Sequence, residues 1–135
     1  MLFRVLSWLL ISILVWPVGA STLQDGIDFW HSGDRASAVA VWGPLAEQGD
    51  AEAGLFLAYA YRNGLGVERH YGLAARWYRY AAERGHPEAQ YELALMYELG
   101  LGVPQDANEA AAWYGLSSAQ TCPAELTAGG RLGDR

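Results

Sequence analysis

The chain has 135 residues, of which 52% are hydrophobic, and its formal net charge is −6 at pH 7. This length allows one domain, and the mixture of apolar, aromatic and small residues is that of an ordered globular chain, not of a disordered or fibrous one. Nucleic acid is excluded as the expected partner, because an acidic surface repels phosphate groups and no Arg cluster stands apart from the acidic residues.

Residues 1–20 have the pattern of a cleaved secretory signal. Arg4 precedes an apolar run from Val5 to Trp16, and small residues at positions 18–20 stand directly before Ser21. An uncleaved membrane anchor is the alternative, but the run is shorter than the roughly 20 apolar residues that span a bilayer. We therefore expect a bacterial protein that is periplasmic or secreted, with no stable membrane anchor after the signal is cut.

Residues 21–48 are expected to form a degenerate N-terminal helix pair that turns at positions 32–34. Ala38, Glu47 and Gly49 each match the residue 36 positions later, and Trp42 falls opposite Tyr78 in the same register. This stretch is thus a diverged copy of a unit that recurs further along the chain.

A tandem repeat occupies the centre of the chain. Residues 49–84 and 85–120 align without a gap, and 14 of the 36 aligned pairs are identical. The tetrapeptide Gly64-Leu65-Gly66-Val67 recurs at 100–103, and the pair Trp77-Tyr78 recurs at 113–114. Such a fixed period is the signature of a repeat architecture.

Each repeat is expected to contain two helices around a glycine corner. In the first repeat Asp50 is a candidate N-cap for a helix to Asn63, and a second helix is expected over about 71–84. In the second repeat Pro87 suits a first helical turn, and the spacing of Asp106 and Glu109 predicts an acidic capping box before a helix over about 107–119. Residues 121–135 are expected to be a C-terminal tail with at most a short capping helix.

A helix pair of this size cannot bury its apolar stripe alone, so the sequence predicts an all-α fold, a short α-solenoid of antiparallel helix pairs. The residues that carry the pattern also resemble the Sel-1-like repeat, a relative of the tetratricopeptide repeat with a glycine-rich loop between its helices. They are Ala53, Leu57, Ala58, Tyr61, Gly64, Gly66, Val67, Ala74, Trp77, Tyr78, Ala81, Ala82 and Gly85, and the second copy matches through Tyr114.

Two positions depart from the family pattern. The first repeat has His70 where the family usually has the Asp that caps the second helix, which predicts a weaker helix start. The second repeat has Ser117-Ser118 where the family favours Ala-Ala, which is consistent with the end of the array.

The resemblance implies an exported adaptor or scaffold that binds another protein or peptide and performs no catalysis. The alternative is a β-lactam-binding protein or β-lactamase-like hydrolase, as associated with a cysteine-rich branch of the family. The single cysteine, Cys122, argues against that branch, because a lone Cys cannot close an internal disulfide.

No cofactor or metal is expected. The Gly-x-Gly pairs lack the preceding strand and the third glycine of a dinucleotide fingerprint, and no Gly-Lys-Ser/Thr comes after them, which favours a structural turn over a phosphate loop. His31, His70 and His86 are scattered, and none has a His or Cys at metal-ligand spacing.

The candidate protein-binding residues are Phe56, Tyr59 and Arg62. Phe56 aligns with Glu92, so the repeat itself does not demand an aromatic residue there, and the three recur at i, i+3 and i+6 on the first helix of the repeat. The alternative is that Phe56 packs against a neighbouring helix. Trp77, Trp113, Tyr61 and Tyr97 are expected to be buried between helices, since they recur at family core positions.

Overall fold

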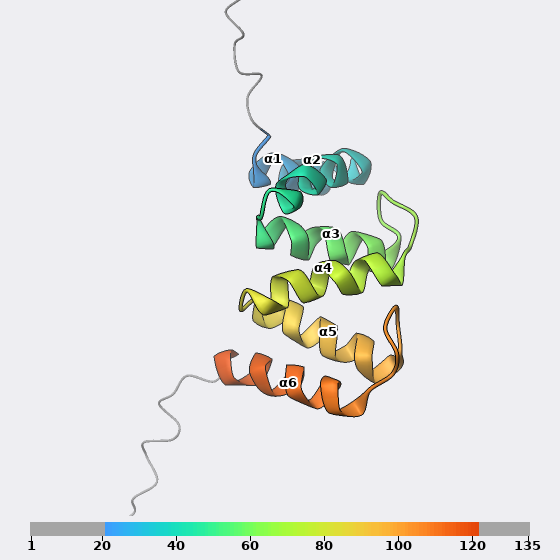
Figure 1. Ribbon diagram of the computed structural model, residues 1–135. Helices are drawn as coiled ribbons and strands as arrows, with labels where there is room; N and C mark the ends of the chain where they lie inside the picture. Colours follow the sequence, from blue (N-terminus) through green and yellow to red (C-terminus); the bar gives the residue numbers. More distant parts are fainter. Residues whose placement is uncertain (1–20, 122–135) are drawn as a thin grey trace, which may run out of the picture.

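The computed structural model describes residues 21–121, and these form six helices and no strand. The helices are stacked in chain order, from α1 at one end to α6 at the other, and each packs on its neighbours in sequence (Figure 1). Their bounds are α1 Leu23–Ser32, α2 Arg35–Glu47, α3 Ala51–Asn63, α4 Tyr71–Glu83, α5 Pro87–Leu99 and α6 Ala107–Thr121. The all-α solenoid expected from the repeat is confirmed.

We call α1, α3 and α5 the first helices and α2, α4 and α6 the second helices of the three successive pairs. None of the six helices is long and apolar enough to span a bilayer. The expected signal segment, Cys122 and the tail after Thr121 lie outside the described residues.

Side chains that accept hydrogen bonds define most helix starts. The Asp50 carboxylate accepts from two backbone N–H groups in the first turn of α3, both at 3.0 Å. Thr22 and Asp25 form a complete capping box at the start of α1. α5 instead begins at Pro87, where a missing N–H costs no hydrogen bond.

The capping box expected at Asp106 and Glu109 is only half formed. The Asp106 carboxylate accepts from two N–H groups of the first turn of α6, at 2.9 and 3.1 Å. Its own N–H donates to the carbonyl of Tyr97 at 3.0 Å, and so is engaged in closing the glycine loop. His70 closes the first loop in the same way, on the carbonyl of Tyr61 at 2.8 Å.

His70 also caps α4. The sequence predicts a weaker start for this helix, because the family usually has Asp at this position. Its ring Nδ1 accepts from the backbone N–H of Leu73 at 3.0 Å. A ring nitrogen therefore takes the place of the carboxylate that caps α6.

The two glycines of the Gly-x-Gly corner have different structural roles. Gly64 ends α3 in the left-handed conformation, with φ +66°. Gly66 is also left-handed, and a Cβ atom there would overlap the carbonyl of Arg35 at the start of α2. Gly102 in the second repeat approaches the backbone of Tyr71 at the start of α4 equally closely. The second glycine therefore lets each loop contact the preceding second helix.

The largest fully buried side chains are Trp42, Tyr78, Leu93 and Met96. The expectation that Trp77 and Trp113 are buried is wrong in degree, since both pack against the core and remain partly exposed. Adjacent residues on a helix point about 100° apart, so Trp77 and Tyr78 meet different surroundings. Tyr78 shares its face with buried alanines at 74, 81 and 82 and takes the interior place.

Candidate protein-binding site

A groove of about 360 Å³ lies between the first helices α1 and α3, and we call it the first-helix groove. Its lining is mainly apolar and aromatic. The lining residues are Ile27, Trp30 and His31 of α1, Trp42 of α2, Leu55, Phe56 and Tyr59 of α3, Tyr78 of α4 and Glu88 of α5.

Phe56 and Tyr59 lie side by side in this groove but are differently exposed. Phe56 is partly buried and stacks on Trp42, with ring centroids 4.9 Å apart and planes at 26°. Tyr59 is 44% exposed and meets Trp30 edge to face, with centroids 6.1 Å apart. Phe56 is thus shared between core and groove, whereas Tyr59 presents its ring to solvent.

Arg62 does not line the groove. Its guanidinium forms an ion pair with the carboxylate of Glu92 on α5, at 2.5 Å, and both side chains are largely buried. The structure therefore brings two of the three predicted site residues together and turns the third toward the next repeat.

Two buried polar atoms near the groove have no hydrogen-bond partner within the described residues. They are Nε1 of Trp42 and the hydroxyl of Tyr78, and both of these residues line the groove. A buried polar group without a partner costs free energy, commonly about 1–3 kcal/mol. Both atoms are closed off from solvent, and the Trp42 nitrogen lies directly against Gly26 of α1, so they mark close packing under the groove and are not contact points for a ligand.

The groove has an acidic end on α5. Burial is the largest cause that raises the pKa of the Tyr78 hydroxyl above its usual range, and the negative charges of Glu92 and Glu88 add to the effect while Arg62 opposes it. Burial likewise raises the pKa of Glu92, against the attraction of Arg62. Glu88 itself is exposed at the edge of the groove.

The sequence reasoning missed Trp42 and Tyr78 as parts of a site. The sequence did contain one indication, because Trp42 and Tyr78 fall opposite each other in the 36-residue register. In the structure both side chains are almost completely buried. The register alone, however, contains no information about whether their polar atoms find partners.

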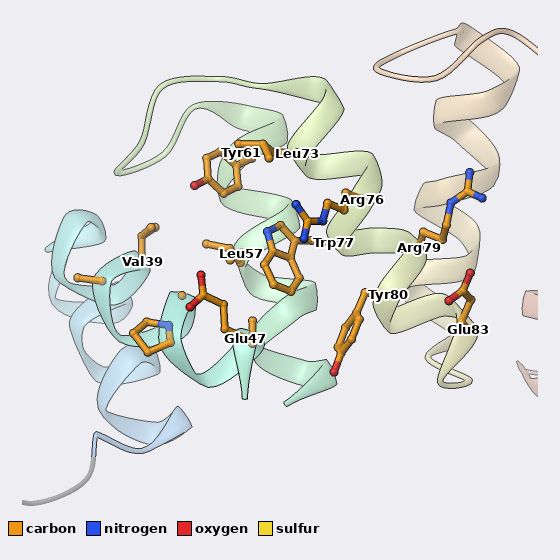
Figure 2. Close-up of a pocket in the computed structure, with 14 residues that line it drawn as sticks. Val39, Glu47, Leu57, Tyr61, Leu73, Arg76, Trp77, Arg79, Tyr80 and Glu83 are labelled. Atoms are coloured by element: carbon orange, nitrogen blue, oxygen red, sulfur yellow. The ribbon is translucent and has the colours of Figure 1, made fainter. Parts of the chain in front are cut away.

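A second groove, of about 660 Å³, lies between α2 and α4 on the other side of α3, and we call it the second-helix groove. Figure 2 shows Leu57 and Trp77 between the two helices, with Glu47 on the α2 side and Arg76 on the α4 side. Tyr80 meets Trp77 edge to face at 5.7 Å. The charged residues on its walls are balanced in sign.

No group of His, Cys, Asp and Glu side chains within residues 21–121 is arranged to hold a metal ion.

The model of the Sel1 repeat matches residues 51–86 and 87–122, which together make up more than half of the chain. The chain belongs to the Sel1 repeat family. Sel1 repeats typically mediate protein–protein interaction and are typically non-catalytic. No curated protein sequence matches the chain.

Two solved structures share the Sel1 fold with this chain. A Sel1 repeat protein from Oxalobacter formigenes is 31% identical with a TM-score of 0.69, over 73% of this chain and 78% of that one. The protein c5321, a protective antigen of uropathogenic Escherichia coli strains with an SLR fold, is 35% identical with a TM-score of 0.67, over 73% of this chain but only 22% of its own length. These comparisons give no support to the hydrolase alternative.

Proposed function

We propose that this protein is an exported Sel1 repeat adaptor that binds another protein or peptide in the first-helix groove and has no catalytic activity of its own. The observation that carries the proposal is an apolar, aromatic groove in which the exposed ring of Tyr59 lies beside Phe56 and Trp30.

The residue types support this choice of surface. Tyr and Trp are enriched at interface hot spots, where a rigid aromatic side chain contributes large contact area at a small cost in entropy.

The three predicted site residues take different roles in the proposal. Tyr59 is the contact residue, because its ring is accessible. Phe56 forms the floor through its stack on Trp42. Arg62 lies outside the groove, where its ion pair with Glu92 directs it toward the next repeat, so it is not a contact residue in the proposal.

Site-specific photo-crosslinking tests the location. A benzoylphenylalanine placed at Tyr59 should give an adduct in the envelope fraction, and the same group at Tyr80 in the second-helix groove should not. With the purified partner, Tyr59→Ala should weaken binding at least about tenfold, the effect of losing a hot-spot side chain of about 1.4–2 kcal/mol. Crosslinking from position 80 alone would place the partner in the other groove.

Export and the absence of catalysis are tested separately. Intact-mass measurement on protein recovered from the envelope should give a chain that begins at Ser21. A chain that keeps Met1 and stays in the membrane contradicts processing, and turnover of nitrocefin by the purified protein contradicts the non-catalytic part.

A further inference from the structure

Charged residues are distributed unevenly between the first helices and the second helices. The first helices carry six carboxylates and one Arg, whereas the second helices carry three carboxylates and three Arg. The acidic residues of the first helices are Asp25, Asp28, Glu52, Glu88, Glu92 and Glu98, and Arg62 is their one Arg. The first-helix side is therefore strongly acidic, and the second-helix side is neutral.

Most of the carboxylates on α1 and α5 already have partners. Asp25 completes the capping box with Thr22, and Asp28 accepts from Gln24 at 2.8 Å. Glu98 accepts from the Tyr114 hydroxyl at 2.7 Å.

Glu88 is different, because it lines the first-helix groove with neither a hydrogen bond nor an ion pair from any residue that the structure describes. Its charge acts on the unpartnered hydroxyl of Tyr78, which is 1% exposed. The groove thus combines an apolar aromatic wall with an exposed carboxylate at its edge.

We propose that the segment bound in the first-helix groove is cationic, with an apolar side chain placed against Trp30, Phe56 and Tyr59 and a Lys or Arg beside it paired with Glu88. This inference rests on the proposed binding function of the same groove. The surplus negative charge of the first helices attracts such a segment over a distance and raises its association rate at low salt.

Charge also argues against a second copy of the chain as the occupant. Residues 21–121 carry 13 carboxylates and six Arg, so two copies repel each other. The second-helix groove, with its balanced charges, gives no comparable preference for a cation.

A random dodecapeptide library displayed on phage and selected on the immobilised mature protein tests the inference. The recovered peptides should be enriched in Lys or Arg next to an aromatic or aliphatic residue. Their affinity, measured by fluorescence anisotropy, should fall as salt rises. Glu88→Gln should weaken them about two- to fivefold, the range of an exposed ion pair. Glu83→Gln, which removes the same charge from the second-helix groove, should leave the affinity unchanged.

The outcomes separate the two proposals. Peptides that bind at least tenfold more weakly to Tyr59→Ala, but carry no excess of Lys or Arg or ignore Glu88→Gln, overturn the cationic segment and leave the groove as the binding site. Peptides that ignore Tyr59→Ala overturn the groove itself. A selection that enriches nothing over the uncoated support, or a dimer in sedimentation that Tyr59→Ala dissociates, overturns the cationic segment.

Discussion

Phe56 of α3 stacks on Trp42 of α2, with ring centroids 4.9 Å apart. This contact joins the first Sel1 repeat to the helix pair that precedes it. The same ring also forms part of the first-helix groove. Because Phe56 serves the core as well as the groove, its truncation should affect both stability and binding, and the exposed Tyr59 is the cleaner probe of binding.

The burial of the aromatic residues predicts an order of stability among Trp variants. Trp42 is 2% exposed, so Trp42→Ala should lower the free energy of unfolding by about 3–5 kcal/mol. Trp113→Ala should cost clearly less, since that ring keeps part of its surface in water. Urea unfolding followed by circular dichroism measures both, and equal losses would mean that Trp113 is more deeply packed than we describe.

Two glycines in the left-handed conformation, Gly66 and Gly85, predict a contrast between their substitutions by alanine. Gly85→Ala meets open space and should cost about 1–2 kcal/mol for the backbone alone. Gly66→Ala should cost about 1–3 kcal/mol more, because its Cβ overlaps the carbonyl of Arg35. Thermal or urea unfolding compares them, and a Gly66→Ala variant as stable as Gly85→Ala would show that the loop moves away from α2 freely.

The ion pair between Arg62 and Glu92 should couple the first helices of successive repeats. Both side chains are about one-fifth exposed, at 22% and 21%, so the pair is only partly screened by water. A double-mutant cycle with Arg62→Met and Glu92→Gln should give a coupling energy of about 1 kcal/mol. A coupling near zero would contradict a stable pair in solution.

The cap of α4 predicts a stabilising substitution. His70→Asp should raise the free energy of unfolding by about 0.5–1 kcal/mol, because a carboxylate both accepts from the first turn and interacts favourably with the positive end of the helix dipole. Asp106 at the same place before α6 shows that the backbone accommodates it. The control is His86→Asp at the start of α5, where the existing residue makes no side-chain cap bond. No gain in the urea midpoint for His70→Asp would show that the imidazole caps as well as a carboxylate.

Alkaline pH should destabilise the protein through two tyrosines. Loss of solvation, with the hydrogen bond to Glu98 and its charge, raises the pKa of Tyr114 to about 12, and burial raises that of Tyr78 further. Since phenolate forms more readily in the unfolded chain, near pH 10, this stability is complete below pH 10 and is lost as the pH rises toward the folded pKa values. The urea midpoint should therefore fall from pH 10 upward, and less steeply in a Tyr78→Phe, Tyr114→Phe variant. An equal slope in that variant would assign the loss to other groups.

The repeat pattern was sufficient to predict the all-α solenoid and the positions of its main helices. A 36-residue period with glycines at fixed places and apolar residues at helical spacing leaves few ways to bury the apolar stripe. The pattern also singled out Phe56, because its aromatic ring aligns with Glu92 of the second copy, and helical spacing then added Tyr59 and Arg62.

Periodicity by itself determined which helices this protein forms, because helix formation and capping depend on residues within a few positions of one another. Only the tertiary structure decided that Tyr78 faces inward while Trp77 stays partly exposed, that Arg62 pairs with Glu92 of the next repeat, and that Gly66 must let a loop contact the start of α2. Each of these depends on how one helix pair is rotated and placed against the next. That placement results from packing between residues far apart in the sequence, which a local pattern does not encode.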